Sequence, residues 1–218
     1  MELLGDLPPE DRRQILAGGR RRRFAAREVL FHEGDPADSF LLLDTGRVAI
    51  RASTPVGDIV TFAVLGPGDV LGELALIGGD ARRSATVVAL EDVEAWAFTA
   101  DTFHRLRREV PGAEAFFLQT LADDVRRLSG LLLEALYLPV EARVLRRVID
   151  LERTYRRGPP PTDVPLNQDT LASLAGSSRA TVNKVLRAAE DAGLVSLRRG
   201  GVVVNDPDAL AHRGTHRR

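Results

Sequence analysis

The chain has 218 residues, of which 44% are hydrophobic and 28% are charged, a composition typical of globular proteins with room for two domains. It contains no cysteine, which excludes disulfides, iron–sulfur clusters, thiolate zinc sites and cysteine catalysis. No apolar run approaches the roughly 18 residues needed to cross a bilayer, and the N-terminus lacks the basic start of a signal peptide, so we expect a cytoplasmic protein without a membrane partner.

The formal net charge of −1 is unevenly distributed along the chain. Residues 1–138 contain 16 basic and 22 acidic side chains, whereas residues 139–218 contain 14 basic and 9 acidic ones. A basic C-terminal part on a nearly neutral chain indicates that this part alone binds a polyanion.

The first half of the chain has the pattern of an antiparallel β-structure. After a short helix expected over residues 8–17, the basic run Arg20 to Arg23 is typical of the solvated edge of a strand. From Phe24 to Phe98, short apolar segments alternate with glycine turns, which predicts an antiparallel sandwich or barrel. His32 and His104 are isolated in the sequence, so we expect no metal site.

Within this region, the stretch from Gly72 to Thr86 predicts a phosphate-binding site. It places an acid, several small residues and a cation between two apolar segments, and residues 74–83 are expected to form a short helical turn whose free N–H groups face an anion. Arg83 offers a guanidinium to a phosphate, and Glu73 offers an acceptor to a ribose hydroxyl. A phosphate and a sugar hydroxyl together indicate a nucleotide. The alternative is an ordinary surface ion pair beside a glycine turn.

Residues 113–138 change to a helical period. Six apolar residues recur at steps of three and four, which is an a/d seam, namely Leu118, Leu121, Val125, Leu128, Leu132 and Ala135. The charged residues expected on the outer face are Asp123, Asp124, Arg126 and Arg127. A seam this regular predicts a dimer helix, and packing of a single helix on its own barrel is the alternative.

The C-terminal part has the pattern of a helix-turn-helix. Counting Gln168 as the first position, small, glycine and branched residues occupy the fifth, ninth, fifteenth and eighteenth positions, namely Ala172, Gly176, Val182 and Val185. The small residue lets the two helices cross closely, the glycine permits the left-handed turn between them, and the branched residues pack in their interface. Ser178 is expected to cap the second helix, which places four residues on one exposed face, namely Arg179, Ala180, Asn183 and Lys184.

A wing is expected after this helix. Residues 194–204 form two β-type segments around an Arg-Gly-Gly turn. The arginines of that turn, Arg198 and Arg199, can reach a phosphate backbone. The C-terminal part therefore has the composition and the pattern of a DNA-binding module.

Two of these strings resemble a known family. Gly72-Glu73-Leu74-Ala75-Leu76 with Arg83-Ser84-Ala85-Thr86 resembles the phosphate-binding cassette of cyclic-nucleotide-binding domains. Residues 177–186 resemble the recognition helix of the superfamily of the cyclic AMP receptor protein and the fumarate–nitrate regulator (Crp-Fnr). The resemblance implies the nucleotide-binding residues Gly72, Glu73, Leu74, Arg83, Ser84 and Ser129, and DNA contacts by Ser178 together with the four face residues and the two wing arginines.

The resemblance also implies an architecture and a function. The fold class is α+β, with an N-terminal antiparallel jelly-roll barrel over residues 1–112, a dimerisation helix over 113–138 and a winged helix-turn-helix over 139–218. The implied protein is a homodimeric transcription regulator rather than an enzyme. A cyclic nucleotide, cyclic AMP before cyclic GMP, allosterically places two recognition helices about 34 Å apart on palindromic double-stranded DNA.

Some positions depart from the family pattern. Cyclic AMP receptor proteins carry a Thr-Ser pair that meets the adenine, whereas this chain has Leu128-Ser129, and a leucine cannot hydrogen-bond a base edge. Ala180 replaces a glutamate of the recognition helix. Two alternatives therefore stay open: a regulator of the same fold that needs no nucleotide, and an interaction scaffold that binds no DNA. By the same resemblance, the run Arg20 to Arg23 is a candidate contact for RNA polymerase.

Overall fold

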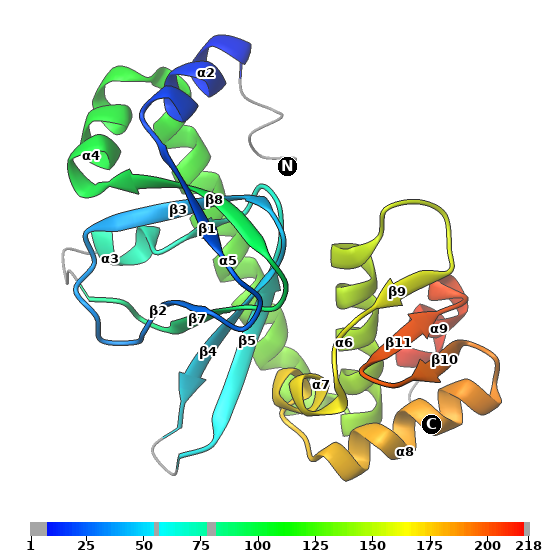
Figure 1. Ribbon diagram of the computed structural model, residues 1–218. Coiled ribbons are helices and arrows are strands. Elements are labelled where there is room, and N and C mark those ends of the chain that lie inside the picture. Colours follow the sequence, from blue (N-terminus) through cyan, green and yellow to red (C-terminus); the bar gives the residue numbers. More distant parts are fainter. Residues whose placement is uncertain (1–7, 55–56, 78–81, 216–218) are drawn as a thin grey trace. The chain divides into compact units, whose positions relative to one another are not determined.

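The computed structural model describes residues 8–54, 57–77 and 82–215 (Figure 1). Contacts between residues divide the chain into two units. The first comprises the chain up to Ser53 together with Phe62–Leu128, and the second comprises Thr54–Thr61 together with Ser129–Arg218.

Antiparallel strands build the first half of the chain. They are β1 (Arg20–Phe24), β2 (Val29–Phe31), β3 (Ser39–Thr45), β4 (Val48–Ser53), β5 (Ile59–Leu65), β6 (Val70–Leu71), β7 (Thr86–Ala89) and β8 (Val93–Thr99). One four-stranded sheet has the order β1-β8-β3-β6 and the other has the order β2-β7-β4-β5. The predicted fold class is confirmed, and the two sheets are open at their edges rather than closed into a continuous barrel.

Alternation along β3 explains how one strand serves two cores. Leu41 and Leu43 point to one side and pack with residues of both sheets, including Val48 and Val87. Phe40 and Leu42 point to the other side, towards the helices. There the Phe40 ring stacks on that of Phe98 at a centroid distance of 4.6 Å. The central strand is therefore buried on both faces.

Helices cover the outer side of the β1-β8-β3-β6 sheet. They are α2 (Pro9–Ala17), α3 (Glu73–Ile77), α4 (Ala100–Glu109) and the first turns of α5 (Pro111–Tyr137). Thr99 caps α4 by accepting a hydrogen bond from the Thr102 N–H at 3.2 Å. The helix predicted over residues 74–83 occupies only Glu73–Ile77 among the described residues, and residues 78–81 lie outside them.

The second unit is a winged helix-turn-helix. Its elements are α6 (Val140–Tyr155), β9 (Thr162–Val164), α7 (Gln168–Ala175), α8 (Arg179–Asp191), β10 (Val195–Arg198), β11 (Gly201–Val204) and α9 (Pro207–Thr215). The three strands form a sheet in the order β10-β11-β9. Gly176 has φ 55° and ψ 52° between α7 and α8, the left-handed turn that the sequence predicts.

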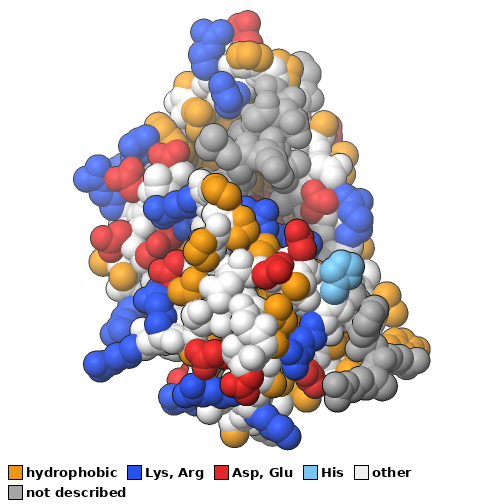
Figure 2. All heavy atoms as spheres, turned by 90° about the vertical axis from the view of Figure 1, so that its right-hand side faces the viewer, with side chains coloured by type: hydrophobic (Ala, Val, Ile, Leu, Met, Phe, Trp, Pro, Cys, Tyr) orange, Lys and Arg blue, Asp and Glu red, His pale blue; other side chains and the backbone are white. Residues whose placement is uncertain are grey.

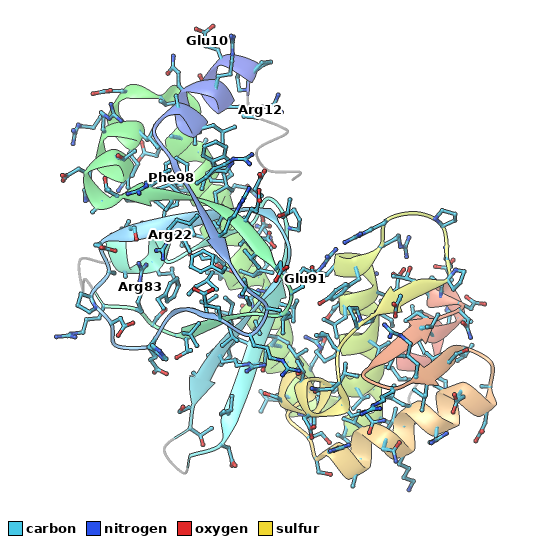
Figure 3. All side chains as sticks on the ribbon, viewed as in Figure 1. Glu10, Arg12, Arg22, Arg83, Glu91 and Phe98 are labelled. Carbon is cyan, nitrogen blue, oxygen red and sulfur yellow. The ribbon has the colours of Figure 1, made fainter. Side chains whose placement is uncertain are left out.

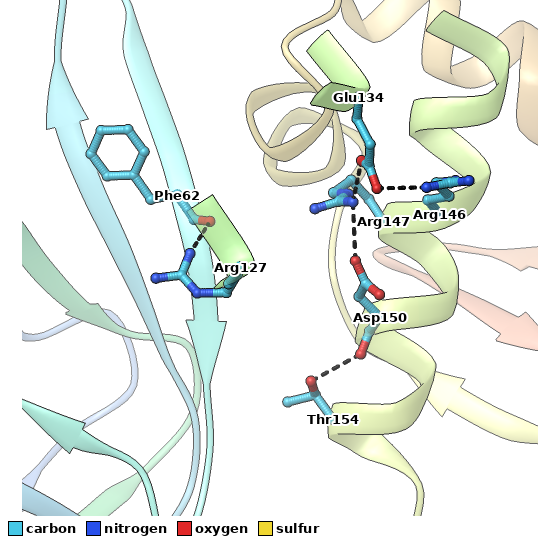
Figure 4. A network of polar contacts seen from close by, with 7 residues as sticks. All are labelled: Phe62, Arg127, Glu134, Arg146, Arg147, Asp150 and Thr154. Carbon is cyan, nitrogen blue, oxygen red and sulfur yellow. Dashed lines mark hydrogen bonds and ion pairs between the residues drawn. The ribbon is translucent and has the colours of Figure 1, made fainter. Parts of the chain in front are cut away.

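A charged cluster ties the last turns of α5 to α6 (Figure 4). Glu134 accepts hydrogen bonds from Arg146 Nη1 at 3.0 Å and from Arg147 Nη2 at 2.6 Å. Arg147 also pairs with Asp150 at 3.2 Å, and burial raises the pKa of the Asp150 carboxyl. Two helices that meet at Pro139 are thereby fixed to each other by one carboxylate and two guanidinium groups.

Candidate nucleotide pocket and nucleic-acid interface

A pocket in the first unit collects the residues of the predicted cassette. Its enclosed volume is about 90 Å³, and it opens to solvent. Apolar side chains from β2, β4, β5, β6 and β7 form one part of its wall, and α3 and the segment before β7 form another. The polar and charged lining residues are Glu73, Arg83, Ser84, Asp124 and Arg127, and Gly72 and Leu74 also line it.

Glu73 is the buried acid of this pocket. The residue is the first of α3, and only 3% of it is exposed. Its Oε2 atom has no hydrogen-bond partner among the described residues. Burial raises the pKa of the Glu73 carboxyl from 4.5 to about 7, and the nearby charge of Asp124 adds to the shift. An unpartnered buried acceptor is costly, so its presence in a pocket indicates a ligand that supplies a donor.

Arg83 is the buried cation of the same pocket, and Figure 3 shows it beside the β2 and β7 strands. The residue is 6% exposed, and Nη1 donates to the carbonyl oxygens of Ser39 at 2.7 Å and Gly72 at 3.3 Å. Its guanidinium lies 4.2 Å from the centre of the Phe31 ring, and Nε is buried with no hydrogen-bond partner in residues 8–54, 57–77 and 82–215. Asp38 is 3.6 Å away, which leaves the buried charge only loosely paired. Burial lowers the pKa of Arg83.

Arg83 lies so close to the backbone at position 72 that only glycine fits there. The φ of Gly72 is 83°, and a Cβ at this position would lie 2.2 Å from Arg83 Nη1. Any side chain there would displace the guanidinium. The glycine before the acid therefore holds the cation of the pocket in place, besides forming the turn that starts α3.

The structure corrects the predicted position of two charged residues on α5. Asp124 and Arg127, expected on the outer face, line the pocket and pair with each other at 2.8 Å. Arg127 also donates to the Phe62 carbonyl oxygen at 3.2 Å (Figure 4). Asp123 and Arg126 are exposed as expected, whereas Ser129 is exposed and does not line this pocket. Both inward residues directly precede seam positions, but the heptad pattern alone does not show which flank of the helix faces the pocket.

The burial of Glu73 predicts a pH-dependent stability that Glu73→Gln removes. The folded chain keeps the proton up to about pH 7, whereas the unfolded chain loses it near pH 4.5. Rising pH between these values therefore favours the unfolded state, by up to about 3 kcal/mol. Urea unfolding from pH 4.5 to 8 should show the variant gaining stability relative to the parent across this window, and exposed Glu114→Gln serves as the control. A constant difference between variant and parent would contradict the burial of a protonated acid.

The second unit exposes the face that the sequence assigns to DNA. Along α8, Arg179, Ala180, Asn183 and Lys184 are exposed, and Ser178 caps the helix by accepting from the Thr181 N–H at 3.1 Å. The opposite face is buried and consists of Val182, Val185, Leu186 and Ala189. Arg179 pairs with Asp169 at 3.4 Å, but both side chains are more than half exposed, so a phosphate or base can replace this contact.

The two wing arginines differ in the structure. Arg198 Nε donates to Asp163 Oδ1 at 2.8 Å, and Nη2 reaches both oxygens of the same carboxylate. Arg199 lies at the exposed turn and has no hydrogen bond or ion pair within the described part of the chain. Figure 2 shows basic and acidic side chains interspersed over the face in view. Of the two wing arginines, Arg199 is therefore the one without a partner among the residues that the structure describes.

Matches to known proteins cover both units. The family model of the cyclic nucleotide-binding domain matches residues 21–109, and that of the Crp-like helix-turn-helix domain matches residues 142–213. The cyclic AMP receptor protein of Thermus thermophilus is 33% identical over 208 residues, which cover 95% of this chain and 94% of the relative. The chain belongs to the Crp-Fnr superfamily.

Further similarities agree with this assignment to the Crp-Fnr regulators. The CRP-like cAMP-activated global transcriptional regulator of Mycobacterium tuberculosis is 28% identical, with 87% of this chain and 86% of the relative covered. The crystal structure of the Thermus thermophilus catabolite activator protein matches at 30% identity and a TM-score of 0.56, with 99% of this chain and 100% of that chain covered. These relatives are transcription regulators and not enzymes. The chain is thus a DNA-binding transcription regulator with a cyclic nucleotide-binding domain.

One structural neighbour is named for a different ligand. The c-di-GMP responsive global regulator CLP of Xanthomonas campestris has a TM-score of 0.75 at 23% identity, with 91% of this chain and 99% of that chain covered. At that identity the likeness shows the fold alone.

Within residues 8–54, 57–77 and 82–215, no helix is both long and apolar enough to span a membrane. In the same residues, no three His, Asp or Glu side chains cluster as a metal site requires.

Proposed function

We propose that this protein is a homodimeric regulator whose first unit binds a cyclic mononucleotide, with cyclic AMP as the first candidate and cyclic GMP as the second. Its second unit reads a palindromic operator. The ligand favours one arrangement of the dimer helices, which spaces two copies of α8 for successive major grooves about 34 Å apart. Residues 1–112 serve as effector domain, 113–138 as dimer helix and 139–218 as DNA-binding domain.

The observation that carries the ligand proposal is the pair of unpartnered buried atoms in one pocket. Glu73 Oε2 needs a donor and Arg83 Nε needs an acceptor, and the chain supplies neither among its described residues. A ribose hydroxyl and a cyclic phosphate supply both at once. Gly72, Leu74 and Ser84 line the same space and complete the cradle. The names of the cyclic AMP-dependent relatives support the same class of ligand.

The dimer proposal is supported by the second half of α5. Among its described residues, five of the six seam positions are exposed in the single chain, and Leu121 alone is half-buried. Leu133, Leu136 and Tyr137 extend the apolar surface towards the end of the helix. An apolar stripe of this length on one helix is typical of a two-stranded coiled coil.

Calorimetry with cyclic AMP, cyclic GMP and cyclic di-GMP tests the ligand. Saturable binding of one equivalent of cyclic AMP or cyclic GMP per chain, absent in Glu73→Ala, is the expected result. Tight binding of cyclic di-GMP alone would replace the mononucleotide, and binding of none of the three would favour a regulator that works without nucleotide. Leu128 supports that second candidate, because a leucine cannot hydrogen-bond a base edge.

The recognition face predicts separable effects of three arginines on DNA binding. Arg179→Ala should weaken the selected operator by about 1–3 kcal/mol and flatten preference at one base pair, because a bidentate guanine contact is lost. Arg199→Ala should weaken all sequences similarly and lower the salt slope by about one unit for each wing. Arg198→Ala should change the slope less, because Asp163 already neutralises that side chain.

Binding-site selection on random DNA, followed by titration at several salt concentrations, measures these effects. Recovery of no palindromic consensus would contradict a dimeric reader. A consensus unaffected by Arg179→Ala would move the reading face away from the start of α8.

Contact with RNA polymerase through β1 has less support. Arg21 pairs with Asp44 at 3.1 Å and with Glu94 at 3.2 Å, and Arg23 pairs with Glu94 at 2.9 Å. Half of the basic run is therefore neutralised within the chain. Arg20 and Arg22 stay exposed and are the residues through which such a contact would act.

A further inference from the structure

Arg143 lies beside the turn of the helix-turn-helix, and its side chain has no hydrogen-bond or ion-pair partner among the described residues. It lies in the second turn of α6, and its Nη1 atom is 3.6 Å from the position that a Cβ on Gly176 would occupy. Gly176 is the left-handed residue that joins α7 to α8, and it is exposed. The guanidinium is therefore packed against the segment that leads directly into the recognition helix.

None of the three nitrogen atoms of Arg143 has a hydrogen-bond partner among the described residues. Nε is buried, whereas Nη1 and Nη2 are not among the buried unpartnered atoms and thus reach solvent. Neighbouring arginines are engaged differently: Arg146 and Arg147 of α6 bind Glu134, and Arg156, which directly follows the helix, binds Glu152. Arg143 is thus oriented by packing and not by a carboxylate.

An arginine held in this way is suited to an anion. Burying Nε without a partner disfavours folding, and no hydrogen bond from the described part of the chain offsets this cost. The planar guanidinium binds a phosphate with two parallel N–H donors, and a fixed side chain loses little conformational entropy when it does so. Ser178 and Arg179, which follow Gly176 by two and three residues, are among the residues that the proposed function places at the duplex.

We propose that Arg143 is a DNA-backbone anchor that binds one phosphate beside the turn between α7 and α8. This inference rests on the proposed DNA-reading function of α8. The phosphate would fix the entry of α8 into the major groove, while the base-contacting residues on α8 read the sequence. Arg143 would therefore raise the affinity for every DNA sequence by the same factor, without favouring one sequence over another.

Titration of the full-length protein with a labelled operator and with a random-sequence duplex, both with cyclic AMP present over a range of salt concentrations, tests the anchor. Arg143→Gln should lower the affinity for both duplexes by about tenfold and reduce the salt slope by about two units per dimer, one phosphate for each protomer. The ratio of the two affinities should stay unchanged. Arg143→Lys should keep most of the salt slope, because the charge is retained.

Two comparisons keep the anchor falsifiable. Arg153→Gln removes an exposed charge from the same helix and should leave both titrations unchanged. If Arg143→Gln alters only thermal unfolding and leaves both salt slopes intact, the arginine is structural and the anchor is wrong. If the operator alone is weakened, Arg143 reads a base and the anchor is also wrong. If the parent protein binds neither duplex, the proposed DNA function fails together with the anchor.

Discussion

Replacing Arg83 by alanine is expected to lower the affinity for cyclic AMP by about ten- to a hundredfold. The charge-assisted hydrogen bonds between a guanidinium and a phosphate contribute about 1.5–3 kcal/mol, and the 6% exposure of Arg83 keeps water from replacing them. Calorimetry on the parent and the variant measures the change. The same loss is expected for cyclic GMP, because both ligands carry the same cyclic phosphate.

Arg82→Ala provides the matched control for this prediction. Arg82 is adjacent in sequence, but it is exposed and donates to the Gly34 carbonyl oxygen at 2.8 Å outside the pocket. Arg83→Lys separates charge from geometry, since it keeps a cation but loses the two parallel donors. Because Arg83 also binds the Ser39 and Gly72 carbonyl oxygens, thermal unfolding of each variant must accompany the titration. An alanine variant that folds and binds like the parent would contradict the phosphate assignment.

Local chemistry made much of the fold readable from the sequence. Glycine turns between apolar segments predicted the antiparallel strands, and the spacing from Gln168 to Val185 predicted the two crossing helices and the left-handed turn at Gly176. Each of these signals comes from residues within one or two turns of each other. The order of strands in the two sheets could not be derived in this way, because it depends on pairings such as that of β1 with β8, about 70 residues apart.

The nucleotide pocket was only half predictable, for a related reason. Glu73 and Arg83 lie ten residues apart in one recognisable string. Asp124 and Arg127 come from a different element, where the heptad pattern shows which residues form the seam but not which flank of the helix meets the sheets. The position of these two charges at the pocket therefore depends on tertiary packing. The same holds for Glu73 Oε2, which has no hydrogen-bond partner among the described residues.

Strand pairing between residues far apart in the sequence also determines part of the DNA-binding unit. The sequence places Arg198 and Arg199 side by side, and nothing in it distinguishes them. The structure does, because β9 pairs with β11 and brings Asp163 to Arg198. The same limit applied to Arg143, whose lack of a partner is visible only when every neighbouring carboxylate has been placed.

The dimer prediction has the largest expected effect, and the structure improves the choice of residues. Leu118 and Leu132 are 62% and 60% exposed in the single chain, so aspartate at these positions leaves the core of each unit intact. Leu118→Asp with Leu132→Asp removes four leucines per dimer, each worth about 1.5–3 kcal/mol when buried, and sets like charges opposite each other. Sedimentation should show monomers, and operator binding should fall to the level of random DNA.

Two charges added elsewhere on the same helix separate the seam from a general effect of charge. Ala115 and Gln119 are exposed on α5 and lie outside the seam, so Ala115→Asp with Gln119→Asp should stay dimeric. Circular dichroism should show equal helix content in both double variants, because the seam substitutions act on association and not on folding. If the seam variant sediments as a dimer and still binds the operator, the two chains associate through another surface, and the apolar stripe of α5 then requires a different partner.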